Sequence, residues 1–138
     1  MPKEFPLKPR GFSPFLELVG VNFETIENGY SRAILKLKKK LLNSSGIIHG
    51  GATFTLIDCG MGAALFSIIE ETDRVQTLET QIIYFKSAGS GVLVCDTRVL
   101  NRSRRIATLE SEVKHKDELI AKALGTFSIS KGKRIGGK

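Results

Sequence analysis

One long apolar run stands out from the pattern of hydrophobic and polar positions in this chain. Between Gly50 and Ile69 the only charged residue is Asp58. A run of this length is too long for one strand, and we expect a helix from His49 to about Glu70 that is apolar nearly all round. Its length also suits a membrane span. However, four glycines, two threonines, a serine and the central charge favour a helix buried inside a soluble fold.

Upstream of this run, short elements are expected. Ser13 followed by a proline is typical of a helix start and predicts a short helix over 14–18. Strands are then expected over 21–25 and 30–38, joined by the hairpin signal Asn28-Gly29. One face of the second strand is expected to carry Ser31, Ala33, Leu35 and Leu37.

Downstream of the run, apolar and polar residues alternate with the period of two that strands show. Strands are expected over 76–85, 91–100, 105–114 and 119–129. We expect them to form a four-strand antiparallel meander with one dry face, which the long helix covers. The sequence therefore predicts an α+β fold, with an antiparallel sheet wrapped around one long central helix. The inward-facing residues are expected to be Ala107, Leu109, Ser111 and Val113, then Leu119, Ala121, Ala123, Phe127 and Ile129.

Net charge says little about function, because it is concentrated at the two ends. Of the formal charge of +7, residues 1–10 carry +2 and residues 131–138 carry +4. We expect solvated ends and no nucleic-acid partner. The whole of 1–138 is expected to form one domain, with an extended lead-in over 1–11 and a basic, flexible tail over 130–138.

The two cysteines point to a reducing compartment. Cys59 and Cys95 each lie in an apolar stretch and outside any Cys-x-x-Cys pattern. We expect two reduced, buried thiols, which suits a cytoplasmic protein. A zinc site or a redox site has no support from these positions.

Asp58 is the first candidate for catalysis. Burying an unpaired carboxylate costs free energy, so a lone aspartate in an apolar run needs a reason. It could act as a general base, as a nucleophile, or as a structural carboxylate that accepts hydrogen bonds from backbone donors. Composition favours a functional role over a structural one.

Gly50 and Gly51 open the expected helix, where the first backbone N–H groups have no partner inside the helix. Without side chains they would let a ligand approach, and the helix dipole favours negative charge there. This arrangement suits an oxyanion hole, although two glycines also suit a flexible junction. Just upstream, Asn43 and His49 add a carboxamide and an imidazole, which could instead form a turn and anchor the loop.

The spacing of His49 and Asp58 predicts more than one subunit. They are nine positions apart, which on a helix puts them on opposite faces and about 13 Å apart along the axis. They cannot join one site within one chain. If both are catalytic, each works with a residue of another subunit, so we expect a homodimer with composite sites at its interface.

The stretch from Asn43 to Ala64 also carries a motif. It reads N-x5-H-G-G-x6-D, ending at Asp58, and is followed by G-x-G-A-A. This pattern resembles the hotdog-fold thioesterases, specifically the acyl-CoA thioesterase branch that is similar to phenylacetate-pathway enzymes. The order of the expected elements agrees with that family over nearly the whole chain. The resemblance implies a hotdog fold, an acyl-CoA substrate, no metal or redox cofactor, and dimers that commonly pair into tetramers.

By the same resemblance, Asp58 matches the residue that activates the attacking water or attacks the thioester itself. Gly50 matches the backbone donor that polarises the thioester carbonyl. Asn43 and His49 match the polar pair that shapes the loop and the leaving-group side. Thr77 falls near a hydroxyl position that helps to hold the water in some members. Two other functions on this fold stay open: a non-catalytic acyl-CoA-binding protein and a hydratase or dehydratase.

Substrate contacts are expected from two further groups of residues. The walls of the substrate pocket are expected to include Gly51, Phe54, Ile57 and Met61. Coenzyme A carries phosphates, so a basic rim is expected near the site, although the same residues could form a solvated turn. The candidates for this rim are Lys86, Arg102, Arg104 and Arg105.

Overall fold

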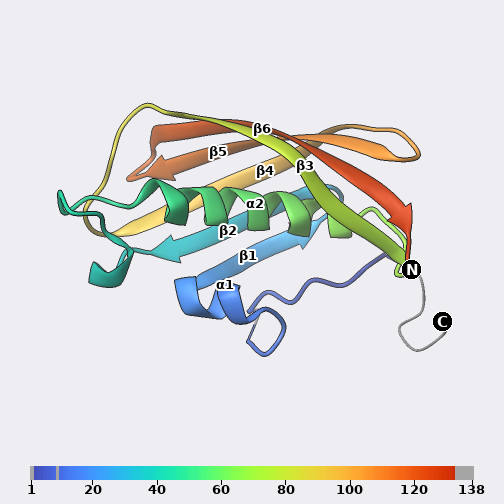
Figure 1. Cartoon of the computed structure of the whole chain (residues 1–138), viewed down its shortest axis with the longest axis horizontal. Helices are drawn as coiled ribbons and strands as arrows, with labels where there is room; N and C mark the ends of the chain where they lie inside the picture. The colour runs from blue at the N-terminus through green and yellow to red at the C-terminus, as the bar shows by residue number, and fades with distance from the viewer. Residues whose placement is uncertain (1, 9, 133–138) are drawn as a thin grey trace.

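In the part of the chain that the structure describes, residues 2–8 and 10–132, six antiparallel strands form one curved sheet around a long helix (Figure 1). The structure is a computed structural model. Its helical segments are α1 (Pro14–Val19), a short 3₁₀ turn (Lys39–Leu41) and α2 (Gly50–Phe66). Its strands are β1 (Val21–Glu27), β2 (Tyr30–Lys36), β3 (Asp73–Tyr84), β4 (Val92–Arg102), β5 (Ile106–His115) and β6 (Glu118–Lys131). This arrangement confirms the expected hotdog fold.

The turn signals of the first half are confirmed. Ser13 caps α1, because its side chain accepts a hydrogen bond from the Leu16 N–H at 3.4 Å. Asn28 and Gly29 have φ angles of 50° and 77°, the left-handed conformation that a two-residue hairpin needs. The hairpin fixes how β1 and β2 pair.

The expected four-strand meander is wrong. The strand order is β1-β2-β4-β5-β6-β3, so of the four strands expected in the meander only β4, β5 and β6 follow one another across the sheet. β3 pairs with β6 at the far edge, and β2 takes the place beside β4. A period of two shows which residues face the core, but not which strands are neighbours. The long segment 85–91 between β3 and β4 lets the chain cross the sheet instead of turning back.

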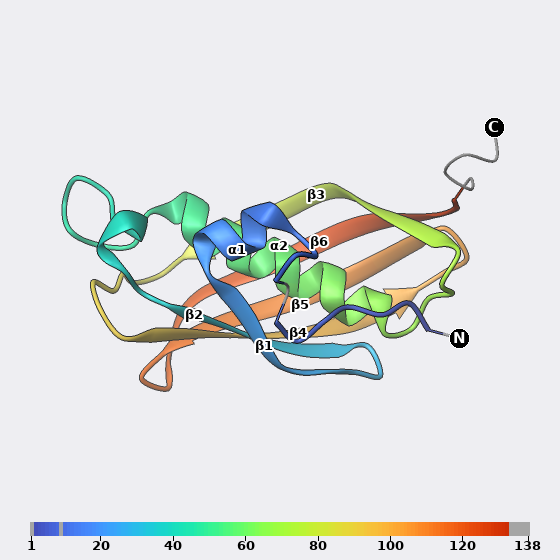
Figure 2. The ribbon, with the colours of Figure 1, turned by 90° about the horizontal axis from the view of Figure 1, so that it is seen from below.

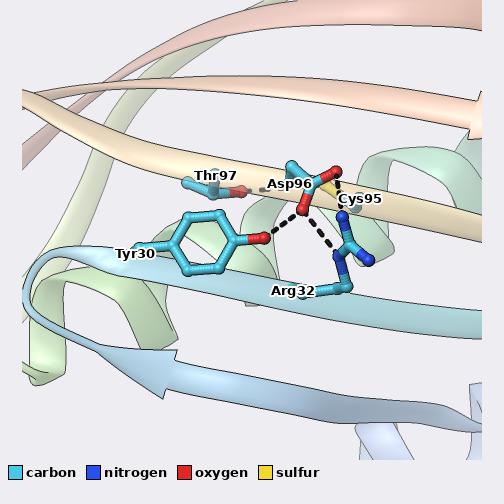
Figure 3. Close-up of polar contacts among 5 residues, drawn as sticks. All are labelled: Tyr30, Arg32, Cys95, Asp96 and Thr97. Carbon is cyan, nitrogen blue, oxygen red and sulfur yellow. Dashed lines mark hydrogen bonds and ion pairs between the residues drawn. The ribbon is translucent and has the colours of Figure 1, made fainter.

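Polar side chains on the outer face of the sheet help to explain why β2 lies beside β4. Arg32 is opposite Asp96 in the register, and its Nε donates to a carboxylate oxygen at 2.9 Å. The Tyr30 hydroxyl donates to the same oxygen, so both side chains converge on Asp96 (Figure 3). Burial alone would raise the pKa of Asp96, but these hydrogen bonds outweigh it and hold that pKa below its ordinary value. A register shift would leave the carboxylate without these partners.

The expected end of the long helix is corrected. α2 ends at Phe66 instead of near Glu70. The hydroxyl of the next residue, Ser67, donates to the Ala64 carbonyl at 2.6 Å and accepts from the Gly29 N–H at 2.7 Å. These contacts terminate the helix and tie its end to the β1–β2 turn.

The expected start of the basic tail is also corrected. Ser130 and Lys131 belong to β6, and Lys131 Nζ lies 2.8 Å from the Asp73 carboxylate at the start of β3. The Lys131 contact, together with the Glu70 N–H, lowers the pKa of Asp73. Residues 133–138 of the expected tail lie outside the described residues.

A β-bulge in β6 changes which residues face the helix. Val113 of β5 pairs with Ala121, whereas the following Lys114 pairs with Leu119, so Ile120 is the extra residue. Ile120 and Ala121 are both buried, at 3% and 1% exposure. Leu119, which was expected to face inward, is only half-buried. The strict alternation expected for this strand is therefore wrong near its start.

α2 approaches the sheet closely at Gly60. The Gly60 carbonyl accepts a hydrogen bond from the Ser31 hydroxyl of β2 at 2.6 Å. Near it, the buried hydroxyls of Thr97 and Ser111 bond to each other at 2.7 Å. A Cβ at Gly60 would lie only 2.9 Å from Thr97 Oγ1, which is closer than side chains normally approach. Glycine is therefore required at this position by packing.

We expect Gly60→Ala to lower the free energy of unfolding by about 1–3 kcal/mol, the usual cost of overpacking a dense core. Urea unfolding followed by circular dichroism measures this loss. In a Thr97→Ala background the same substitution should cost less, because the clashing oxygen is gone. An equal loss in both backgrounds would contradict the clash as its cause.

Candidate active site

Asp58 lies on a face of α2 that the sheet leaves partly uncovered. With Gly51, Phe54 and Gly62 it forms a stripe of exposed or half-buried residues that recurs every three or four positions. The Thr77 hydroxyl of β3 donates to the Asp58 carboxylate at 2.7 Å. Two residues that the family resemblance named together are thus in contact. The carboxylate is half-buried and held in place by a neutral hydroxyl.

The N-terminus of α2 has one capped and one uncapped glycine N–H. His49 is the cap residue, and its Nδ1 accepts from the Gly51 N–H at 2.8 Å. Because Nδ1 accepts this bond, Nε2 is the ring nitrogen that is left to donate. The Gly50 N–H has no hydrogen-bond partner among the residues that the structure describes. Of the two glycines expected to bind a ligand, only Gly50 offers a free donor.

Asn43 shapes the loop that leads to this N-terminus. Its side-chain oxygen accepts from the Ser45 N–H at 2.8 Å and from the Ile47 N–H at 3.4 Å. Its own N–H donates to the Ile47 carbonyl at 2.7 Å. These are the contacts of a turn-forming asparagine, and they support the loop-shaping role that the resemblance implied.

A pocket of about 280 Å³ lies beside Gly50. Tyr84 forms one wall, and its hydroxyl donates to the Gly50 carbonyl at 3.0 Å. Sequence reasoning missed Tyr84, although an aromatic residue near the end of an expected strand was a usable signal. It named Gly50 and Lys86 but missed the remaining walls, which come from the first turn of α2, from the loops on either side and from the β6 bulge. The pocket is lined by Ile47, Ile48, Gly50, Thr53, Tyr84, Lys86, Ser87, Ile120 and Ala121.

The expected basic rim is divided between the two ends of the molecule. Lys86 lies at the pocket beside Gly50 and pairs with Glu118 at 3.1 Å on the surface. Arg102, at the end of β4, and Arg104 and Arg105, in the β4–β5 turn, lie at the opposite end of the fold (Figures 1 and 2). There they line a hollow of about 550 Å³ together with Asp73 and Lys131. Lys86 and the arginines do not meet within one chain.

The remaining expected pocket walls differ in exposure. Phe54 is 41% exposed on the Asp58 stripe, whereas Ile57 and Met61 are fully buried. Met61 packs against β6 at Gly125, where a Cβ would overlap its sulfur. Within one chain, Phe54 is therefore the only one of these three side chains that a ligand could reach.

The thiols of Cys59 and Cys95 differ in exposure. Both are free; Cys95 is buried as expected, whereas Cys59 is half-buried. Burial raises the pKa of both thiols, that of Cys95 to about 12. Within residues 2–8 and 10–132, three or more His, Cys, Asp or Glu side chains nowhere gather in a way that could hold a metal ion. In the same residues, every helix is too short or too polar to span a membrane.

Residues 45–122, which include His49, Asp58 and Thr77, match the family described as the thioesterase superfamily. The chain belongs to this superfamily. A Saccharolobus solfataricus protein whose name includes the word esterase is 32% identical to it over 112 residues, which cover 80% of this chain and 74% of that protein.

Two solved structures are similar to this chain of the thioesterase superfamily. The conserved protein PA5202 of Pseudomonas aeruginosa matches with a TM-score of 0.83 and 36% identity, covering 86% of this chain and 94% of that one. A variant of the phenylacetic acid degradation protein PaaI of Thermus thermophilus matches with a TM-score of 0.78 and 26% identity, covering 84% and 98%. The resemblance to hotdog thioesterases that the motif indicated is confirmed.

Proposed function

We propose that this chain hydrolyses acyl-CoA thioesters to a free carboxylic acid and coenzyme A. The observation that carries the proposal is the Gly50 N–H at the head of α2. Among the described residues it has no partner, and it lies beside a largely apolar pocket. A free N–H at a helix N-terminus can stabilise negative charge that develops on a carbonyl oxygen.

In the proposed reaction, Asp58 takes a proton from a water molecule while the water oxygen attacks the thioester carbonyl carbon. The carbonyl oxygen becomes an oxyanion, which accepts a hydrogen bond from the Gly50 N–H. Collapse of this intermediate breaks the C–S bond, and the CoA thiolate leaves and takes up a proton. Attack by the Asp58 carboxylate itself, followed by hydrolysis of the resulting anhydride, uses the same groups. Thr77 orients the carboxylate in either route.

The proposed site needs two chains. Gly50 and Asp58 are eight residues apart on one helix, or about 12 Å along its axis. β3 is an edge strand, and the exposed side chains of Leu78 and Phe85 lie on it or just beyond it. Two-fold antiparallel pairing of two β3 strands would lay the α2 helices side by side in opposite directions. Gly50 of one chain would then approach Asp58 of the other, and we propose that such dimers pair into tetramers.

This dimer also gives the separated basic residues a common role. Antiparallel pairing would bring the Asp73 end of one β3 beside the Tyr84 end of the other. The arginine turn of one chain would then lie on the same side as the Gly50 pocket of its partner. We propose that Arg102, Arg104 and Arg105 contact the CoA phosphates across the dimer, and that Lys86 contributes from the pocket side.

Replacing Arg104 and Arg105 together by alanine is therefore expected to raise the KM for an acyl-CoA by about tenfold, with little change in kcat. The KM for the matching acyl-pantetheine thioester, which lacks the nucleotide, should stay unchanged. Steady-state kinetics on both substrates measure this difference. An equal rise for both thioesters would show that the arginines act on the fold and not on the phosphates.

Release of free thiol from a panel of acyl-CoAs tests the proposed function directly. The panel should include acetyl, hexanoyl, decanoyl and phenylacetyl esters, and we expect turnover of at least one. Hydration of an enoyl-CoA without thiol release would identify a hydratase instead. Tight binding of acyl-CoA with no turnover would identify a binding protein. Either result would overturn the proposal.

A further inference from the structure

The β6 bulge supplies part of the inner wall of the pocket beside Gly50. A regular strand would bury only every second residue, but at the bulge the consecutive residues Ile120 and Ala121 are both buried. These two residues line the pocket together with Thr53, which lies on the first turn of α2. The β6 bulge and the free Gly50 N–H therefore lie at the same pocket.

The pocket is closed at its inner end. Ile48, Thr53, Ile120 and Ala121 are all less than a tenth exposed, so the hydrophobic core lies behind them. The polar and charged side of the pocket is its outer side, where Ser87 and Lys86 are exposed. Coenzyme A must keep its phosphates in water, and its pantetheine arm carries two amides that need hydrogen-bond partners. A closed, mainly apolar pocket suits the acyl group better than it suits either part of coenzyme A.

The volume of the pocket limits the acyl group. A cavity of about 150 Å³ lined by apolar side chains holds one benzene molecule, and drug-sized ligands occupy roughly 300 Å³ or more. The 280 Å³ beside Gly50 lies between these values. It has room for one aromatic ring on a short linker, or for a medium straight chain, but not for a long fatty acyl chain.

We infer that this pocket binds the acyl group of the substrate and restricts the enzyme to compact acyl groups, up to about one aromatic ring, with Ile120 and Ala121 setting the limit. This inference rests on the proposed function. It adds the substrate class and the residues that determine it.

Ala121→Leu tests the inference, because it puts an isobutyl group where a methyl group now stands. We expect the ratio of kcat/KM for phenylacetyl-CoA to that for acetyl-CoA to fall by about tenfold or more. Ile120→Ala should act in the opposite direction and raise kcat/KM for decanoyl-CoA relative to hexanoyl-CoA. The control is Lys122→Leu, the next residue on β6, which is exposed on the outer face. It should leave both ratios unchanged.

The other outcomes contradict the inference. An equal loss with every acyl-CoA in the Ala121→Leu chain would mean that the pocket holds the pantetheine arm. Unchanged ratios in both pocket variants would mean that it holds no part of the substrate. If the wild-type chain hydrolyses no thioester, the proposed function fails, but the pocket can still be tested with free phenylacetate. Phenylacetate should then shift the NMR signals of Gly50 and Tyr84 in the wild-type and Lys122→Leu chains but not in Ala121→Leu, and equal shifts in all three would overturn the inference.

Discussion

Asp58→Asn is expected to lower kcat for thioester hydrolysis by about 10²-fold or more, the scale of removing a general base. The amide keeps the shape of the carboxylate and can still accept a hydrogen bond from the Thr77 hydroxyl, which now lies 2.7 Å from the carboxylate. It cannot take a proton from water or attack a carbonyl carbon. Stability and the KM should therefore change little. The loss is measured on the best substrate of the acyl-CoA panel.

Thr77→Val provides the matched control. It removes the hydroxyl that holds Asp58 but leaves the carboxylate, so its loss of kcat should be clearly smaller than that of Asp58→Asn. Circular dichroism and thermal unfolding establish that both variants fold. Activity retained in a folded Asp58→Asn chain would exclude Asp58 as the base or the nucleophile. If Thr77→Val loses as much kcat as Asp58→Asn, the Thr77 hydroxyl is as important for catalysis as the carboxylate.

Much of the fold could be predicted because each signal was local. The Asn28-Gly29 turn, the Ser13 cap and the buried face of β5 depend on residues that are close in sequence. The apolar run of α2 predicts a covered helix because any sheet face that it touches must be dry. These elements needed no knowledge of which strand lies beside which.

The strand order could not be predicted, because it depends on contacts between residues far apart in the chain. Arg32 and Asp96 are 64 residues apart and meet only when β2 pairs with β4. The bulge at Ile120 depends on the register between β5 and β6, which the alternation of polar and apolar residues does not specify. One missed pocket wall, Ile120, follows from that bulge, whereas Ile47, Ile48 and Ser87 come from loops that have no periodic pattern.

The candidate site was only partly predictable for the same reason. The spacing between His49 and Asp58 showed that one helix cannot present both residues to one ligand. In the structure, Asp58 accepts a hydrogen bond from Thr77, whereas the Gly50 carbonyl accepts one from Tyr84. Helix geometry is enough for that conclusion. The division of the basic residues between the two ends of the fold needed the tertiary structure.

If the sites are composite, two inactive chains should restore activity when they are mixed. One chain carries Asp58→Asn, and the other carries Gly50→Val, which blocks the free N–H. A Cβ at Gly50 would lie 3.6 Å from the Tyr84 hydroxyl, an ordinary contact, so this variant should fold. After subunit exchange at equal amounts, about half of the dimers are mixed and each has one intact site of two. Activity should therefore recover to about a quarter of the wild-type value.

The reverse mixture separates composite sites from sites within one chain. A chain with both substitutions is exchanged with an equal amount of wild-type chain. In a mixed dimer, each composite site then has one defective half, so only the wild-type dimers are active. The activity should be about a quarter of that of the same total amount of wild-type chain. Sites within one chain would give about half of that reference activity, because half of the chains are wild-type and each stays active. Retention of half, or full activity in a species that ultracentrifugation shows to be a monomer, would disprove the proposed pairing through β3.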